Sequence, residues 1–265
     1  MPPTIGVFDS GFGGLTVLRE LRTVLPGAGY LYFGDTAHLP YGAKSVRTVV
    51  KYAVASAHFL EGHGIEMLVV ACNTATALAL DDIRAAVSVP VVGVVEPGSQ
   101  RAAQFSKAKK VAVIATEATV ASHAYQKALR QLGIEATEKP CPLFVPLVEE
   151  GWVEHSVTEQ VAHIYVDELF HNDATRDADV LLLGCTHYPL IRPLLRRVVP
   201  ARVEIVDSAE STAVRVAELL GSSCGPGGRG SQRCYATDSV DKFRRLGEKF
   251  LGCPIERVEL IDIEK

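Results

Sequence analysis

The chain has 265 residues, of which 48% are hydrophobic and 22% charged, and this balance excludes disorder, collagen and coiled coil as its main architecture. Its 27 Lys and Arg against 31 Asp and Glu give a formal net charge of -4, so no basic excess indicates a nucleic acid or an anionic membrane as partner. The length fits one or two α/β domains, and we expect a small molecule as the partner.

The first residues show no targeting signal. Met1 to Thr4 lead directly into an apolar stretch, without the basic region, long apolar segment and cleavage site of a signal peptide. No apolar run approaches the roughly 18 residues of a membrane-spanning helix. We therefore expect a cytoplasmic protein with no membrane partner. In that reducing compartment the six cysteines should be thiols rather than disulfides.

Short β-branched runs alternate with stretches of helical period, which predicts parallel sheets covered by helices. In chain order we expect strands over residues 4–8, 30–34, 67–71, 89–95, 110–115, 180–184 and 203–207. Helices are expected between them over residues 15–25, 45–63, 76–87, 120–133, 156–173 and 190–199. A helix over 208–220, a helix over 240–250 and a strand over 258–261 complete the chain.

The sequence repeats itself internally. LVVACNTAT (68–76) returns as LLLGCTHYP (181–189), and GVFDSGFGG near the start is mirrored by VAVIATEATV from Val111. After each cysteine block comes a predicted strand and then an acid, Glu96 or Asp207. The repeat predicts an α/β fold of two pseudo-symmetric three-layer α/β/α domains with mostly parallel sheets and an active site in the cleft between them. The domains are expected over 1–97 plus 208–265 and over 98–207.

Residues 221–234 are rich in glycine and predict a surface loop. The loop carries Cys224 and Cys234, but two cysteines fall short of the four ligands of a structural zinc site. We expect free thiols there and no metal.

Ligands of open parallel sheets bind outside the carboxyl ends of the strands. Polar and reactive residues follow four predicted strands here: Asp9-Ser10, Asp35 with Tyr41-Gly42 beyond it, Cys72-Asn73-Thr74, and Cys185-Thr186-His187. Ser10, Asn73, Thr74 and Thr186 would stand next to helix N-termini, where short hydroxyls and amides either cap the helix or bind carboxylates.

Two cysteines occupy equivalent positions of the repeat. A buried cysteine is usually a packing residue, but a strand-to-helix turn can also lower a thiol pKa from about 8.5. Two thiols facing each other suit a racemase, which needs one group to remove a proton and another to return it. Asp9 beside Cys72 and His187 beside Cys185 are then proton partners, although a helix cap and a surface turn residue are the ordinary alternatives. From residues alone, Glu149 is a solvated acid.

Five blocks together resemble glutamate racemase: DSGFGGLTV (9–17), FGDTAHLPYG (33–42), VVACNTATA (69–77), PLVEEG (146–151) and GCTHYPLI (184–191). The resemblance implies a cofactor-independent interconversion of L- and D-glutamate for peptidoglycan synthesis, by a homodimer. It implies catalytic thiols at Cys72 for the D and Cys185 for the L enantiomer, assisted by Asp9, His187 and Glu149. It also implies substrate binding by the pairs Asp9-Ser10, Tyr41-Gly42, Asn73-Thr74 and Thr186-His187.

Parts of the sequence are also compatible with three other functions. A dinucleotide oxidoreductase is suggested by Gly11 and Gly13 with Asp35 about 20 residues on, but Thr16 replaces the third glycine and Asp9 would repel a pyrophosphate. An amino-acid-binding module would also have two lobes, but would leave the paired thiols without a purpose. An aspartate or hydantoin racemase would share the thiol pair, and the glutamate-type blocks argue against it.

Overall fold

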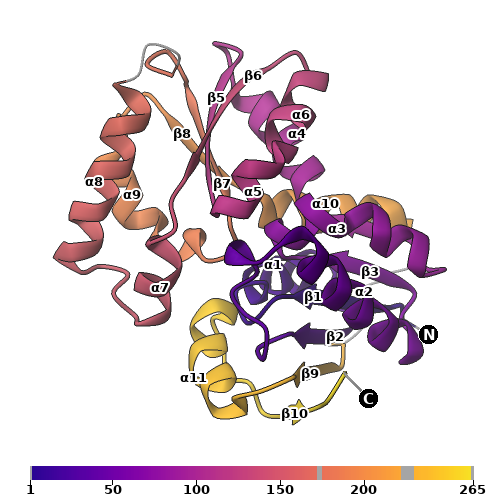
Figure 1. The fold of residues 1–265 in the computed structure, drawn as a ribbon. Helices are drawn as coiled ribbons and strands as arrows, with labels where there is room; N and C mark the ends of the chain where they lie inside the picture. The colour runs from indigo at the N-terminus through magenta and orange to yellow at the C-terminus, as the bar shows by residue number, and fades with distance from the viewer. Residues whose placement is uncertain (1, 172–174, 222–229, 264–265) are drawn as a thin grey trace.

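The computed structural model describes residues 2–171, 175–221 and 230–263. Two separate parallel sheets form its centre (Figure 1). The first contains β1 (Thr4–Asp9), β2 (Gly29–Gly34), β3 (Met67–Val70), β4 (Val91–Gly93), β9 (Gln232–Ala236) and β10 (Val258–Leu260) in the order β10-β9-β2-β1-β3-β4. The second contains β5 (Lys110–Ala115), β6 (Glu135–Pro140), β7 (Val180–Gly184) and β8 (Glu204–Asp207) in the order β6-β5-β7-β8.

The two sheets repeat one strand order. Strands β1 to β4 are arranged 2-1-3-4, and strands β5 to β8 are arranged 6-5-7-8 in the same sense. The two cysteine-bearing segments follow β3 and β7, which are equivalent strands in this order. The arrangement agrees with the repeat in the sequence and confirms an α/β fold built on two parallel sheets.

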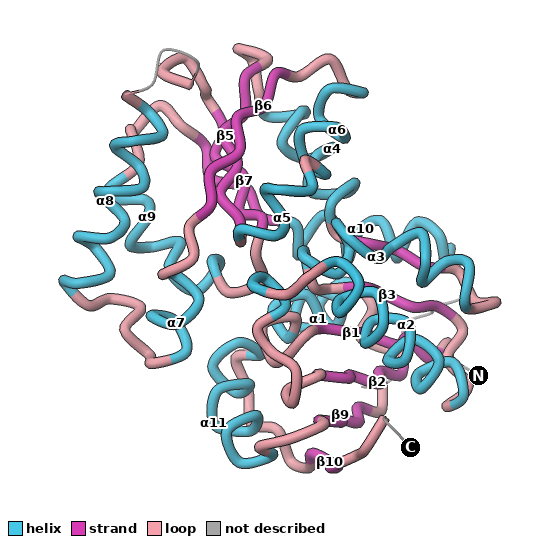
Figure 2. Tube along the Cα trace, in the orientation of Figure 1, coloured by secondary structure: helices cyan, strands magenta, loops and turns pink. Residues whose placement is uncertain are grey.

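Helices cover both sheets. Around the first sheet lie α1 (Leu15–Val24), α2 (Val46–Gly62), α3 (Asn73–Ala86) and α11 (Val240–Leu251), with the short η1 (Tyr41–Ala43). Around the second sheet lie α4 (Val95–Phe105), α5 (Glu117–Ser122), α6 (Ala124–Gln131), α7 (Phe144–Glu149), α8 (Ser156–Phe170), η2 (Tyr188–Ile191) and α9 (Arg192–Val198). Figure 2 shows α8 and α9 on one side of this sheet and α4 and α6 on the other.

We call the six-stranded sheet with α1, α2, α3 and α11 the first lobe, and the four-stranded sheet with α4 to α9 the second lobe. Helix α10 (Ser208–Leu220) connects them, since it packs against α1 of one and α4 of the other. Strands of the first lobe come from both ends of the chain and those of the second from its middle, in keeping with the expected domains. The domain boundaries themselves stay a prediction, and residue 97 falls inside α4.

Three elements of the structure differ from those predicted from the sequence. The strand expected over 89–95 is only Val91–Gly93, because helix α4 begins at Val95 and accommodates Pro97 in its first turn. The helix expected over 120–133 is broken at His123, whose φ is 56°. Strand β6 was not predicted, since its sequence EATEKP is mostly polar and it forms a sheet edge.

The loop expected over 221–234 is corrected in part. Residues 222–229, including Cys224, lie outside the described residues, but Gln232–Ala236 form strand β9 beside β2. Cys234 is therefore a buried strand residue and not a loop thiol. Helix α8 ends at Phe170, and residues 172 and 173 of the helix predicted there also lie outside the described residues.

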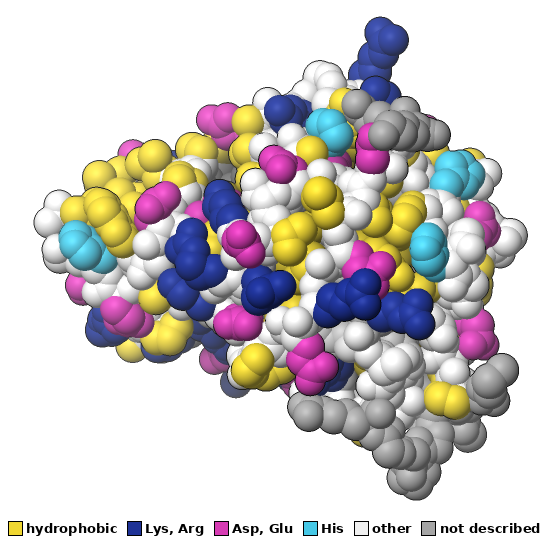
Figure 3. Space-filling view, turned by 90° about the horizontal axis from the view of Figure 1, so that it is seen from below, with side chains coloured by type: hydrophobic (Ala, Val, Ile, Leu, Met, Phe, Trp, Pro, Cys, Tyr) yellow, Lys and Arg dark blue, Asp and Glu magenta, His cyan; other side chains and the backbone are white. Residues whose placement is uncertain are grey.

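The surface agrees with the small net charge. On the face seen in Figure 3, basic and acidic side chains are interspersed, and neither sign dominates. Among the described residues, the helices are all too short or too polar to cross a membrane.

Candidate active site

The two predicted thiols follow equivalent strands and are both buried. Cys72 comes two residues after β3 and is the N-cap of α3, while Cys185 directly follows β7. The exposed fraction is 5% for Cys72 and 7% for Cys185. Burial is the main reason that the pKa of Cys185 is raised, and negative charge on Cys72, Asp9 and Glu149 raises it further.

Cys72 lies among groups from the first lobe. Its S–H donates to Ser10 Oγ at 3.4 Å, and the N–H of Ala75 donates to its Sγ at 3.4 Å. Burial and the carboxylate of Asp9 raise the pKa of Cys72 to about 11, although the Ser10 hydroxyl and the backbone N–H groups of Ala75 and Ser10, which can donate to a thiolate, act in the opposite direction. Burial likewise raises the pKa of Cys185. The backbone N–H groups at the two strand-to-helix turns act on both pKa values in the predicted direction, but burial outweighs them and the net shift is upward.

Asp9 ends β1, next to the segment that carries Cys72. It is 1% exposed, and its Oδ2 accepts a hydrogen bond from the Gly11 N–H at 2.9 Å. Burial raises its pKa, although His187 and three backbone N–H groups act in the opposite direction. Its Oδ1 is buried without a hydrogen-bond partner in the described part of the chain. Asp9 is thus suited to hold or exchange a proton near Cys72.

Cys185 and His187 form the counterpart on the second lobe. The Nδ1 atom of His187 lies 4.0 Å from Cys185 Sγ and 3.5 Å from Thr186 Oγ1. On the other side of the ring, Nε2 lies 3.4 Å from Glu149 Oε1, at ion-pair distance but without hydrogen-bond geometry. The imidazole therefore stands between the Cys185 thiol and a carboxylate.

Glu149 ends α7 and is not the solvated acid expected from residues alone. Its side chain is only 13% exposed, and its Oε2 accepts a hydrogen bond from Lys242 Nζ at 3.1 Å. Burial alone would raise the pKa of Glu149, but His187 and Lys242 outweigh it and the pKa is lowered. The carboxylate is thus held ionised beside His187.

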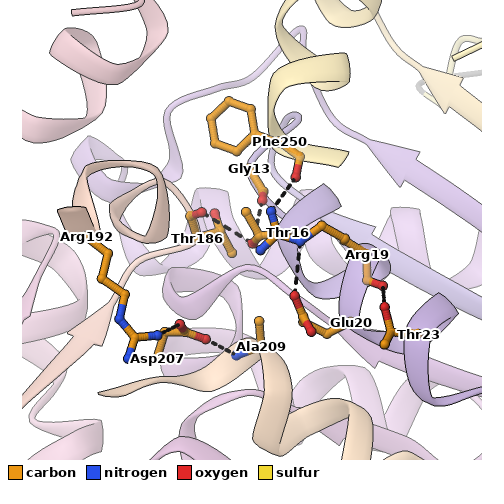
Figure 4. A network of polar contacts seen from close by, with 10 residues as sticks. All are labelled: Gly13, Thr16, Arg19, Glu20, Thr23, Thr186, Arg192, Asp207, Ala209 and Phe250. Carbon is orange, nitrogen blue, oxygen red and sulfur yellow. Dashed lines mark hydrogen bonds and ion pairs between the residues drawn. The ribbon is translucent and has the colours of Figure 1, made fainter. Parts of the chain in front are cut away.

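The start of α1 contacts the Cys185 segment directly (Figure 4). Thr16 Oγ1 donates to the carbonyl oxygens of Gly13 at 3.0 Å and Thr186 at 3.4 Å. A Cβ atom on Gly13 would lie 2.3 Å from Thr186 Oγ1 and 2.6 Å from His187 Nδ1, so glycine is required for this approach. Asp207 in the same view caps α10 through the Ala209 N–H and pairs with Arg192 at 3.4 Å, which gives it a structural role.

Tyr41 and Gly42 lie in η1 against the second lobe. The Tyr41 hydroxyl donates to Asp35 Oδ2 at 2.6 Å, while His38 and Thr237 occupy the other side of that carboxylate. A Cβ on Gly42 would lie 2.7 Å from Thr116 Cβ. The Tyr41 phenol is thus engaged within the first lobe.

Asn73 and Thr74 begin α3 and reach the second lobe. The hydroxyl of Thr74 lies 2.9 Å from that of Thr116 and 3.1 Å from that of Thr119. Asn73 Nδ2 donates to the Tyr125 hydroxyl at 2.6 Å. Sequence reasoning missed Thr116, Tyr125 and Lys242. In the internal repeat, Thr116 occupies the position equivalent to Ser10, so the repeat could have indicated Thr116. No sequence pattern points to Tyr125 or Lys242.

The predicted residues lie around the two thiols and along the seam between the lobes. Asp9, Ser10 and Cys72 cluster on the first lobe, Cys185, Thr186, His187 and Glu149 on the second, and Asn73, Thr74 and Gly42 lie along the seam. The described residues contain no group of three or more His, Cys, Asp or Glu side chains arranged to hold a metal ion. The arrangement can deliver and accept protons from two sides.

Comparison with known proteins places the whole chain in one family. A family model for Asp/Glu/hydantoin racemases matches residues 13–216. A glutamate racemase from Koribacter versatilis is 58% identical, with 98% of each chain covered. The crystal structure of glutamate racemase from Francisella tularensis in complex with D-glutamate has a TM-score of 0.91 and 36% identity, covering 99% of this chain and 98% of that one.

An aspartate racemase from Picrophilus torridus resembles the chain less. Its TM-score is 0.59 at 18% identity, and the match covers 83% of this chain and 94% of that one. This likeness shows a shared fold alone.

Proposed function

The chain belongs to the Asp/Glu/hydantoin racemase family, as a glutamate racemase, and we propose that it interconverts L- and D-glutamate with Cys72 and Cys185 as alternating base and acid. The observation that carries this mechanism is the pair of buried thiols at equivalent strand ends of the two lobes. Each thiol has its own proton partner, Asp9 or His187. We further propose that the enzyme is cytoplasmic and dimeric and supplies D-glutamate for peptidoglycan.

Substrate binding comes first in the proposed cycle. Glutamate enters between the lobes, and Ser10, Thr74 and Thr186 with nearby backbone N–H groups hold its carboxylates, while Asn73 Oδ1 accepts from its ammonium group. The enclosed site replaces water around the α-carbon with fixed dipoles, which strengthens each of these contacts. The backbone of Tyr41-Gly42 completes the pocket at the seam.

Proton transfer follows from the pKa values of the thiols. Because burial keeps both thiols protonated, a thiolate must be formed by transfer to a neighbouring base, Asp9 for Cys72 or His187 for Cys185. The thiolate then removes the α-proton, with Cys72 acting on D-glutamate and Cys185 on L-glutamate. The opposite thiol donates its proton to the other face of the carbanion. Glu149 stabilises the His187 imidazolium that forms on the L side.

No cofactor takes part in the proposed reaction. The carbanion is stabilised by hydrogen bonds to the α-carboxylate and by the dry environment, which together must supply on the order of 10 kcal/mol. A chelator such as EDTA should therefore leave the rate unchanged.

Circular dichroism of L-glutamate during incubation with the enzyme tests the activity. Cys72→Ser and Cys185→Ser should each lower racemisation by at least about 10²–10⁴-fold, because each removes an acid or base. Cys253→Ser, at a partly exposed thiol away from the site, is the matched control and should retain full rate. L-aspartate should not be turned over. Full activity in either active-site variant would refute the mechanism.

Deuterium incorporation tests for two bases. In D2O, early label should appear at the α-carbon of the product enantiomer, because the thiol that returns a proton carries one from solvent. Equal early label in substrate and product would indicate one base.

A further inference from the structure

We propose that Tyr125 is a positioning residue whose hydroxyl fixes the side-chain amide of Asn73 in the orientation that binds substrate. The inference rests on the proposed function, in which Asn73 holds glutamate next to Cys72. Tyr125 lies in α6 of the second lobe, whereas Asn73 begins α3 of the first. Their hydrogen bond therefore joins the lobes beside the reacting groups.

Asn73 depends on this contact for its orientation. The side chain is 3% exposed, and Nδ2 donates to the Tyr125 hydroxyl at 2.6 Å. This is the single hydrogen bond of the Asn73 side chain within the described part of the chain, and its Oδ1 is buried without a partner. A buried acceptor without a partner is unfavourable, and a ligand donor at Oδ1 would remove this cost.

A carboxamide has nearly the same shape when its oxygen and nitrogen are exchanged. A half-turn of the Asn73 amide would place a donor where the acceptor now stands and would oppose an ammonium group there. The Tyr125 hydroxyl, held at a fixed place, anchors the Nδ2 end of the amide and thereby fixes the position of Oδ1 at the other end.

The position of Tyr125 is itself fixed by the second lobe and by the connection between the lobes. The side chain is completely buried, and its hydroxyl also interacts with the side chain of Ser208, the first residue of α10. Its ring lies against Gly184, because a Cβ there would be 2.9 Å from Tyr125 Cε2. Gly184 directly precedes Cys185. One side chain thus contacts the neighbours of both thiols and sets the Asn73 amide relative to the Cys185 segment.

Tyr125→Phe tests this role, since it removes the hydroxyl and keeps the ring that packs on Gly184. We expect KM for both enantiomers to rise about tenfold, the equivalent of one hydrogen bond, with kcat little changed. Tyr30→Phe is the matched control. It removes a buried hydroxyl that donates to the Leu21 and Leu25 carbonyls, away from the site, and should leave KM unchanged.

A double-mutant cycle separates positioning from general loss of structure. If Tyr125 acts through Asn73, Tyr125→Phe should add nothing to the KM of Asn73→Ala. An unchanged KM in Tyr125→Phe, or a full tenfold increase on top of Asn73→Ala, would overturn the proposal. Calorimetric affinity for D-glutamate in the Cys72→Ser background gives the same comparison without turnover. Failure of the wild-type protein to racemise glutamate would instead refute the proposed function.

Discussion

Burial determines the protonation of the cysteines more than any neighbouring group does. At Cys72, burial raises the pKa more than hydrogen bonds lower it. At Cys141, burial likewise outweighs the nearby cation of Lys139, and the pKa is raised to about 12. A thiol that must act as a base in such surroundings depends on a partner that accepts its proton. In the proposed mechanism, Asp9 and His187 are these partners.

The buried thiols should make the protein lose stability at alkaline pH. The pKa of Cys141 in the folded state lies above its unfolded value of about 8.5, so the stabilisation is present below pH ~8.5 and is lost as pH rises toward 12. Between pH 7 and pH 10 this one group should lower the free energy of unfolding by about 2 kcal/mol.

Urea unfolding at the two pH values measures this effect. In Cys141→Ala, the decrease in the free energy of unfolding between pH 7 and pH 10 should be smaller by about 2 kcal/mol. The cavity left by the substitution should lower the free energy of unfolding equally at both pH values. Val113→Ala, at another buried site of the second lobe, should keep the wild-type pH dependence. An equal decline in wild type and Cys141→Ala would contradict the assignment.

Gly13 is a position where one methyl group should affect catalysis. An alanine there would displace Thr186 and His187, and a displacement of this kind can cost about a hundredfold in rate. Gly62→Ala is the matched control, because its Cβ would meet no atom within 4 Å. It should retain activity and gain up to about 1 kcal/mol of stability. Equal activity of the two variants in the circular dichroism assay would show that Gly13 has no such role.

Helix α11 contributes side chains to a candidate site whose other residues mainly follow the strands of the two sheets. Its Lys242 reaches Glu149 on the second lobe, and its Phe250 lies 5.0 Å from the His187 ring, centroid to centroid. Phe12 completes the apolar surroundings of this imidazole at 5.9 Å. The helix therefore holds the His187 and Glu149 pair from the side opposite Cys185.

Loss of the Lys242 charge should change the pH dependence of the reaction. Lys242 helps to lower the pKa of Glu149, so Lys242→Met should raise that pKa. If Glu149 acts as a carboxylate, the acidic limb of the kcat/KM profile should move to higher pH. Lys242→Arg should restore the wild-type profile, and an unchanged limb in Lys242→Met would show that Lys242 does not act on Glu149. Because the Lys242 side chain is 42% exposed, we expect little effect on stability.

The sequence predicted elements well where hydrophobic pattern and packing agree. Strands β5 and β7 have the predicted bounds, as does α10, because their apolar runs are interrupted sharply by Thr116, Cys185 and Gly221. Strand β9 was missed, since QRCYA has no clear alternation and gains its place by pairing with β2. The strand-end rule found both thiols, Asp9 and His187. It could not find Tyr125 or Lys242, which join the site only through tertiary contacts.

The proposed cycle requires the two lobes to separate before glutamate can reach the thiols. Both thiols are nearly inaccessible in this structure, and polar contacts cross the seam at Thr16, Asn73, Thr74 and Lys242. One hydrophobic cluster also extends from Leu18 and Val216 to Leu183 and Leu195. Opening therefore has to preserve this shared core while breaking the contacts near the thiols.

Alkylation rates should report this opening. Iodoacetamide should modify Cys72 and Cys185 at least about tenfold faster than Cys141, because separation of the lobes exposes the first two, whereas Cys141 requires local unfolding. Saturating D-glutamate should slow only the active-site pair. Mass spectrometry of timed samples resolves each site, and equal rates at all three would argue against such an opening.

The discontinuous first sheet has a consequence for synthesis of the chain on the ribosome. Strand β2 pairs with β9, which is translated about two hundred residues later, so the GYLYFG edge of β2 stays uncovered in the nascent polypeptide until the C-terminal segment emerges. An exposed apolar edge of this kind is a template for wrong pairing. Truncations that end before β9 should accordingly aggregate during expression, even though they contain both reactive cysteines.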